Sequence, residues 1–176
     1  MQIRFAAATD APALAGIYNF YIENSHSTFE IREVSILGME GRLMKTQESG
    51  YPFFVAVHED EIVGYAYGSP FRPREAYRHS VEVSVYIRNG NEGQGIGTRL
   101  YEVLLDKLLD LGFHSIIAGI SLPNEASIKL HERFGFEKVA HFHEVGNKFG
   151  RWIDVEYWQL IAREQSVNLK RSHSSI

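Results

Sequence analysis

The sequence contains no cysteine, and this single absence excludes three kinds of chemistry. The chain can form no disulfide, no thiolate metal site and no covalent intermediate on a cysteine nucleophile. The net charge is −4, and no basic cluster occurs before the C-terminal segment. A nucleic-acid-binding protein is therefore not expected.

The first residues, MQIRFAAATD, lack the long apolar run of a signal peptide or a membrane span. We therefore expect a cytoplasmic protein without a membrane partner. A hydrophobic content of 44% and a charged content of 23% are typical of globular proteins. The length of 176 residues suits one domain with a substantial core. We place that domain at residues 1–161 and expect a polar, flexible tail at residues 162–176.

Apolar periodicity predicts a mixture of helices and strands. Two N-terminal helices are expected, the first capped by Thr9 or Asp10 and the second capped by Ser35 and ended by Gly50. A polar turn over residues 58–61 indicates a β-hairpin between the runs 53–57 and 62–67. Further strands are expected at residues 3–6, 81–87, 139–142 and 153–160, and the segment 69–79 reads as an irregular basic loop.

The most informative segment is VEVSVYIRNGNEGQGIGTRL, over residues 81–100. A strand runs into a loop whose glycines at positions 93, 95 and 97 let successive N–H groups point into one concavity. A helix expected from Thr98 adds its own unpaired N–H groups and the positive end of its dipole. This pattern predicts a cradle for a pyrophosphate, and Glu82 in the strand ahead of it suggests a base beside a nucleotide-containing cofactor.

Two common phosphate-binding patterns do not fit this loop. The Walker pattern fails because Thr98 and Arg99 follow the last glycine, so its lysine is missing. The dinucleotide pattern GxGxxG fails because Thr98 stands where the third glycine belongs.

A second block, IIAGISLPNEASIKLHERFGF over residues 116–136, gives a buried-type strand, a turn with Pro123 and a short helix ended by Gly135. Together the glycine loop and the pattern N-x-x-S-x-x-L-H-E-x-x-G-F resemble the GCN5-related N-acetyltransferases (GNAT). The resemblance covers about residues 2–161. Within the family the chain looks most like the phosphinothricin and methionine sulfoximine acetyltransferases, which share the runs SVEVSVYI, LPNEAS and KFGRWIDVEYWQL.

The resemblance implies the GNAT fold, an α/β (α+β) architecture with a mixed, mostly antiparallel sheet flanked by helices and splayed central strands. It also implies acetyl-CoA as co-substrate. The residues expected to contact it are Gly93, Gln94, Gly95, Ile96, Gly97 and Thr98 in the loop, backbone groups of Val85, Tyr86 and Ile87 in the strand, and Asn124 and Ser127 in the second block. Glu92 departs from the family's usual Gln or Arg, and its side chain can face either the cofactor or solvent.

Glu82 is the candidate general base, in agreement with its place in the family. An α-amine is mostly protonated at neutral pH, so acetyl transfer benefits from a base. Period-two alternation sets Val81, Val83 and Val85 on one face of the strand and Glu82, Ser84 and Tyr86 on the other. The competing reading of Glu82 is an ordinary solvated or ion-paired strand carboxylate.

His131 stands where the family usually has a tyrosine that protonates the departing thiolate. An imidazole can donate that proton directly or through water. The competing reading is a histidine on a helix surface. Of the eight histidines, the seven others lack metal-ligand spacing, so no metal is expected.

The acceptor site is expected around the loop that precedes the base. Arg72 and Arg74 offer planar forks for carboxylate, phosphinate or sulfoximine oxygens, and Pro73 between them stiffens the loop. The competing reading is two solvated loop charges. The resemblance adds a pocket wall of Thr28, Phe29 and Glu30, with Tyr77, Ser84 and Lys148 as further substrate-binding candidates.

These observations predict an enzyme that moves acetyl directly from acetyl-CoA to the α-amine of a small amino-acid analogue. The alternatives are acetylation of a protein N-terminus or of another amine such as an aminoglycoside, and a non-catalytic CoA-binding module. Relatives suggest a homodimer.

Overall fold

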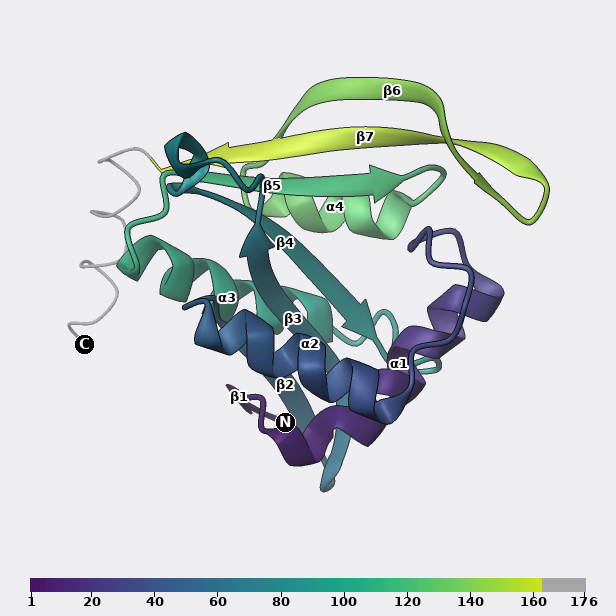
Figure 1. Ribbon diagram of the computed structural model, residues 1–176, viewed down its shortest axis with the longest axis vertical. Helices are drawn as coiled ribbons and strands as arrows, with labels where there is room; N and C mark the ends of the chain where they lie inside the picture. Colours follow the sequence, from purple (N-terminus) through teal and green to yellow (C-terminus); the bar gives the residue numbers. More distant parts are fainter. Residues whose placement is uncertain (163–176) are drawn as a thin grey trace.

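The computed structural model describes residues 1–162. Within that range seven strands form one sheet, in the order β1-β2-β3-β4-β5-β7-β6 (Figure 1). Its strands are β1 (Gln2–Phe5), β2 (Phe53–His58), β3 (Glu61–Pro70), β4 (Ser80–Ile87), β5 (Ser115–Ser121), β6 (Glu137–Lys148) and β7 (Arg151–Ile161). All neighbours are antiparallel except β4 and β5, which run parallel. The expected flexible tail lies, from residue 163 on, outside the described residues.

Four α-helices within residues 1–162 cover the sheet: α1 (Ala11–Asn24), α2 (Ile36–Glu48), α3 (Ile96–Asp110) and α4 (Glu125–Arg133). Helices α1 and α2 lie together over one face of the β2–β4 region, and α3 lies on the opposite face (Figure 1). No helix in the described range is long and apolar enough to cross a membrane. The mixed, mostly antiparallel architecture that the sequence predicts is confirmed.

The local signals that placed the N-terminal helices act in part as expected: Asp10 stands at the N-cap of α1, but its carboxylate makes no cap hydrogen bond and accepts from Arg4 and from the Ala7 N–H. The Ser35 hydroxyl accepts a hydrogen bond from the Gly38 N–H at 3.0 Å, so it caps α2. Pro12 lies in the first turn of α1, where a missing N–H costs little. Helix α3, in contrast, begins at Ile96 and not at Thr98, because Gly95 leaves the loop with φ +77° and serves as its N-cap.

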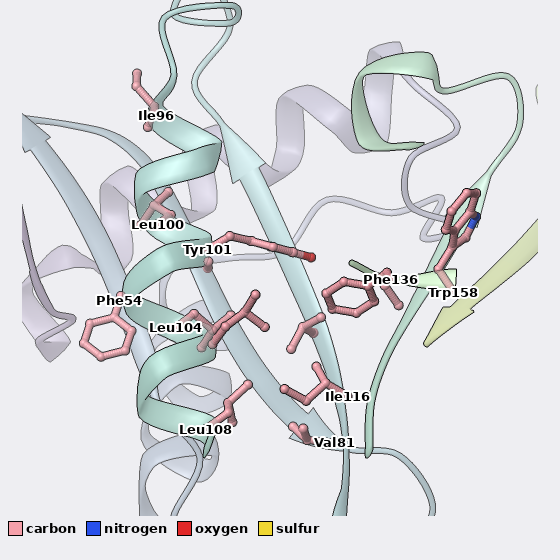
Figure 2. Close-up of a cluster of buried hydrophobic side chains, with 14 of the residues drawn as sticks. Phe54, Val81, Ile96, Leu100, Tyr101, Leu104, Leu108, Ile116, Phe136 and Trp158 are labelled. Atoms are coloured by element: carbon pink, nitrogen blue, oxygen red, sulfur yellow. The ribbon is translucent and has the colours of Figure 1, made fainter. Parts of the chain in front are cut away.

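Alternation along β4 divides its side chains between two cores, as expected. Val81 and Val83 are buried against α3, where Leu100, Leu104 and Leu108 pack on the sheet (Figure 2). On the other face Tyr86 packs with residues of α1, α2 and β3. The two faces of β4 are therefore packed against different layers of the protein.

The central strands part. β4 and β5 pair only over Ser80–Glu82 with Ser115–Ile117, although β4 continues to Ile87 and β5 to Ser121. The segment from Val83 to Ile87 therefore has no pairing with β5. This is the splay that the family resemblance implied.

The C-terminal hairpin differs from the prediction. The sequence predicted short strands at 139–142 and 153–160, whereas β6 spans Glu137–Lys148 and β7 spans Arg151–Ile161. The register of β6 against β7 shifts between Phe142 and Gly146, and Glu144 has φ +51°. A bulge of this kind breaks period-two alternation, so the sequence pattern hid the second half of the strand. A smaller difference is that β3 continues to Pro70, into the segment expected to be loop.

Candidate active site

A cleft of about 690 Å³ opens where β4 and β5 part. Its walls are residues 83–87 of β4, residues 118–121 of β5, the glycine loop with the start of α3, and one face of α4. Most of the cofactor residues named from the sequence line it: Val85, Tyr86, Ile87, Gly93, Gly95, Ile96, Gly97, Thr98, Asn124 and Ser127. Gln94 is exposed and does not belong to this lining.

The glycine loop has the geometry of an anion cradle. Gly93 and Gly95 have φ of +75° and +77°, and a Cβ on either would meet no atom within 4 Å, so both backbones face open space. Gly95 caps α3 without a side chain, and the first N–H groups of a helix have no partner within it. Glu92 does not compete for this space, because its Oε2 accepts from the N–H of Gly90 at 2.7 Å. The carboxylate is thus turned back onto its own turn.

The N-terminus of helix α4 and strand β5 each bring a further polar group to the cleft. Asn124 caps the helix, with Oδ1 accepting from the Ser127 N–H at 3.1 Å, so its Nδ2 is the group it can offer to a ligand. On the facing strand Ser121 Oγ is buried, and within residues 1–162 it is the buried side-chain polar atom left without a hydrogen-bond partner. A buried hydroxyl without a partner at a cleft wall fits a site that receives polar groups of a bound molecule.

His131, for which the resemblance implied a role as proton donor, lines the cleft. It is 2% exposed, and its Nδ1 lies 2.7 Å from the backbone carbonyl of Ser127. Because a carbonyl only accepts, Nδ1 carries the proton and Nε2 accepts from the hydroxyl of Tyr101 at 2.8 Å. Burial lowers the pKa of His131, which favours this neutral form. Both nitrogens therefore have partners within the protein, and the ring joins α4 to α3.

Glu82 lies at the inner end of the parting strands. A Cβ added to Gly119 of β5, which lines the cleft, would lie 3.7 Å from Glu82 Oε1. Burial raises the pKa of the Glu82 carboxyl, and the positive charge of Arg72 acts in the opposite sense. A half-buried carboxylate with a raised pKa is suited to accept a proton near neutral pH.

A second, smaller cavity of about 230 Å³ lies on the α1–α2 face of the sheet. Tyr67 and Ser69 of β3 line it, and in the β3–β4 register they stand opposite Ser84 and Glu82. Ser84 also lines the large cleft. Glu82 lines neither space directly: its carboxylate approaches the large cleft at Gly119, and its strand partner Ser69 lines the smaller cavity.

None of the acceptor residues named from the sequence lines this smaller cavity, and sequence reasoning missed the residues that do, among them Tyr18, Arg42 and Tyr67. The Arg42 guanidinium forms a two-bond fork with Glu30 at 2.7 and 3.0 Å, and it holds the pKa of Glu30 below its ordinary value. Tyr18 contacts both Thr28 and Glu30, at 2.8 and 3.0 Å. Thr28 and Glu30 thus form a wall whose polar atoms are bonded within the protein. A pairing between a loop and a helix twelve residues on leaves no periodic signal in a sequence.

Lys148 differs from its expected role as a substrate ligand. It is 3% exposed, and its Nζ donates to the backbone carbonyls of Tyr21, Ser25 and Thr28 at 3.3, 2.6 and 2.8 Å. Beside it the ring of Phe29 lies against Gly146, where a Cβ would come within 2.3 Å of a ring carbon. The β6–β7 hairpin therefore holds the loop after α1, which carries Thr28 and Phe29.

The arginine loop is exposed. Arg72 lies over the Phe71 ring with its Cζ 4.6 Å from the ring centroid, and it is the cation whose field reaches Glu82. Arg74 and Pro73 are exposed on the same loop. Tyr77 packs edge-to-face on Phe71. The structure thus brings the charge of Arg72 close enough to Glu82 to act on its pKa, whereas Arg74 has no such effect on Glu82.

Comparison with known proteins agrees with this geometry. The family model described as an acetyltransferase (GNAT) domain matches residues 3–157. The chain belongs to the GNAT acetyltransferase family. Among its relatives, a phosphinothricin N-acetyltransferase of Streptomyces coelicolor is 40% identical over 163 residues, covering 90% of this chain and 95% of that protein.

Two further relatives are informative about this GNAT protein. An L-methionine sulfoximine/L-methionine sulfone acetyltransferase of Pseudomonas aeruginosa is 36% identical over 160 residues, covering 90% of this chain and 93% of that protein. A solved GNAT phosphinothricin acetyltransferase from Sinorhizobium meliloti, in complex with AcCoA, is 36% identical with a TM-score of 0.90. That match covers 93% of this chain and 89% of the other.

The buried, neutral state of His131 predicts a specific pH dependence of stability. Because the pKa of His131 is lower in the folded protein than in the unfolded chain, protonation favours the unfolded chain. The free energy of unfolding is therefore highest above the pKa of the unfolded histidine, and it falls as the pH drops through that pKa. Urea unfolding at pH 7.5 and 5.5 should show a smaller pH-dependent loss for His131→Gln than for the parent. His58→Gln, at an exposed position, is the matched control and should lose as much stability between the two pH values as the parent does. Equal losses in parent and His131→Gln would contradict the neutral assignment.

Proposed function

We propose that this protein transfers acetyl from acetyl-CoA to the α-amine of a small amino-acid analogue of the phosphinothricin, methionine sulfoximine or methionine sulfone type. The observation that carries the proposal is the position of Glu82 on β4, where its carboxylate lies beside Gly119 of the cleft with the anion cradle and its strand partner Ser69 lines the small cavity. The two spaces suit a large co-substrate and a small acceptor that meet at a base.

The cleft supplies the contacts that such a co-substrate needs. We assign its pyrophosphate to the N–H groups from Gly93 to Thr98, and its pantetheine arm to Asn124 Nδ2 and the hydroxyls of Ser121 and Ser127. The unpaired edge of β4 over residues 85–87 offers N–H groups to polarise the carbonyl that is attacked. Acetyl-CoA supplies the activated acetyl group.

Glu82 then takes up the proton that makes transfer possible. The acceptor binds as an ammonium, and its proton passes to Glu82 directly or through one water. The freed amine forms the new C–N bond as the C–S bond breaks, and the thiolate takes a proton from water or, in the arrangement expected from the resemblance, from His131. The bonds that His131 makes to Ser127 and Tyr101 favour water.

Removing the base should lower turnover without loosening the co-substrate. Loss of a positioned base typically costs about 10²–10⁴-fold in rate, and Glu82→Gln should lower kcat by that range. The deficit should shrink at high pH as free amine accumulates, and the parent rate should fall as pH drops through the raised pKa of Glu82. Steady-state thiol release measured between pH 5.5 and 9.5 tests this, with exposed Glu75→Gln as the control. A parallel pH profile in Glu82→Gln would remove Glu82 from the mechanism.

The choice of acceptor follows from the charges of the exposed loop that precedes β4. Arg72 and Arg74 suit a molecule with an α-carboxylate beside the amine and a strongly polar tetrahedral group at its far end. We expect the exposed rings of Phe29 and Tyr77 to cover the short methylene chain. A peptide N-terminus has no free α-carboxylate, and an aminoglycoside is a polycation, so both would leave the guanidinium groups poorly matched.

Thiol release from acetyl-CoA across a panel of amines tests the proposal. Phosphinothricin and methionine sulfoximine should be acetylated well, and glutamate and methionine poorly, because their distal groups are planar or apolar. Arg72→Ala should raise the acceptor KM and leave the acetyl-CoA KM nearly unchanged. Preferential acetylation of a peptide or an aminoglycoside would contradict the proposed acceptor, and no thiol release with any amine would indicate a non-catalytic CoA-binding module.

Lys148 should act on the acceptor and not on the co-substrate, because it holds the loop that carries Thr28 and Phe29. Lys148→Met leaves buried carbonyls unpaired, at about 1–3 kcal/mol, which corresponds to about a 5- to 150-fold rise in acceptor KM if the loop moves. The acetyl-CoA KM should stay within about twofold. Lys138→Met, on the same strand but paired with Glu156, is the matched control. A proportional rise in both KM values would show that Lys148 has no selective effect on the acceptor wall.

The proposal extends to a homodimer in the cytoplasm. The β6–β7 hairpin exposes several large apolar side chains, which supports self-association: Phe142, Val145, Phe149 and Trp152. Acetylation of a toxic amino-acid analogue would remove the charge of its amine, so a role in resistance to such compounds is consistent with the proposed acceptor.

A further inference from the structure

A compact group of metal-ligating side chains lies on the β6–β7 hairpin, outside the proposed active site. The register shift after Phe142 sets the bulged part of β6 opposite Asp154 of β7. The N–H of Glu144 in the bulge donates to Asp154 Oδ1 at 2.8 Å, which fixes the carboxylate. Its second oxygen, Oδ2, is thereby presented to two histidines of β6.

Those histidines are His141 and His143, two residues apart on one strand. His141 Nε2 lies 2.7 Å from Asp154 Oδ2, and His143 Nδ1 lies 3.0 Å from the same oxygen. Their rings stack with centroids 4.3 Å apart. The three potential ligand atoms all lie within 4.8 Å of one another.

A second carboxylate lies on the other side of the first histidine. Glu156 is 6% exposed, and its Oε1 lies 3.6 Å from Nδ1 of His141, on the opposite side of the ring from Asp154. Lys138 Nζ and Trp158 Nε1 hold that carboxylate at 3.1 and 3.0 Å. Metal-ligating histidines usually donate their other N–H to such a carboxylate, which fixes the tautomer and the ring orientation.

We propose that His141, His143 and Asp154 form a binding site for a divalent transition-metal ion of the zinc type. Two imidazole nitrogens and one carboxylate oxygen are a donor set that Zn²⁺, Co²⁺ and Ni²⁺ accept. With bonds of about 2.0–2.1 Å, ligand atoms around a tetrahedral ion lie about 3.3 Å apart. The two distances from the histidines to Asp154, 2.7 and 3.0 Å, are already close to this value. The two histidine nitrogens, within 4.8 Å of each other, would have to move closer together, and both side chains are partly exposed and able to turn.

Binding exchanges hydrogen bonds for coordination bonds without any redox change. The ion displaces the protons that lie between the histidines and Asp154 Oδ2, and these protons are released to solvent, while His141 is left neutral with one proton on Nδ1, on the side of Glu156. Three protein ligands leave at least one position for water, so this is an open and exchangeable site. Its structural effect would be to join β6 to β7 at the bulge, on the hairpin whose far part carries Gly146 and Lys148.

Metal titration of tag-free, chelator-treated protein tests the site. Co²⁺ followed by visible absorption, and Zn²⁺ followed by calorimetry, should each give one ion per chain with a Kd below about 0.1 mM. His141→Asn and His143→Asn should each weaken binding by at least about tenfold. Zn²⁺ should also raise the melting temperature of the parent in a concentration-dependent way.

His58→Asn controls for a general loss of surface imidazole, since His58 is exposed on β2 and lies near Glu59. It should bind as the parent does. The side chain of His143 is 77% exposed, so its replacement should leave the fold intact, which circular dichroism without metal verifies. Absence of binding at millimolar metal, or equal binding by the parent and both histidine variants, would overturn the proposal. These readouts do not depend on acetyl transfer.

Discussion

The structure depends on one interrupted pairing. β4 and β5 are hydrogen-bonded over three residues each and then separate, and everything attributed to the site lies in or beside the opening. A strand edge without a neighbour is normally a liability, because its backbone groups need partners. Here the opening is bounded by the glycine loop and α4, and the core against α3 keeps β4 in place (Figure 2). The separation thus leaves backbone N–H groups free to bind another molecule, whereas in a continuous sheet they would be hydrogen-bonded to the neighbouring strand.

Sequence reasoning located what is local. The glycine spacing, the cap at Ser35 and the alternation of Val81 and Val83 each act within a few residues, and the structure follows them. The splay of the strands was an expectation from family resemblance alone, since no residue pattern encodes where two strands distant in sequence stop pairing. The bulge in β6 was missed because it breaks the alternation on which strand prediction rests.

The side-chain roles that sequence reasoning could not settle depend on distant partners. Lys148 reads as an available cation, yet its ammonium group is bonded to carbonyls more than one hundred residues earlier. His131 falls on a motif position associated with proton donation, but Tyr101 and the Ser127 carbonyl occupy its two nitrogens. The fork between Arg42 and Glu30 likewise joins a helix to a loop. In each case the motif placed the residue at the site, and its hydrogen-bond partners decide what it can do there.

Hydrogen–deuterium exchange with and without CoA tests the central claim most directly. If the opening between β4 and β5 and the adjoining glycine loop hold the co-substrate, CoA should slow exchange of the amides at 83–87 and 93–98 at short labelling times. Amides of the β1–β2 pair, at the far side of the sheet, serve as the internal reference and should not change. Unchanged exchange at both segments under saturating CoA, or protection confined to other elements, would contradict the account.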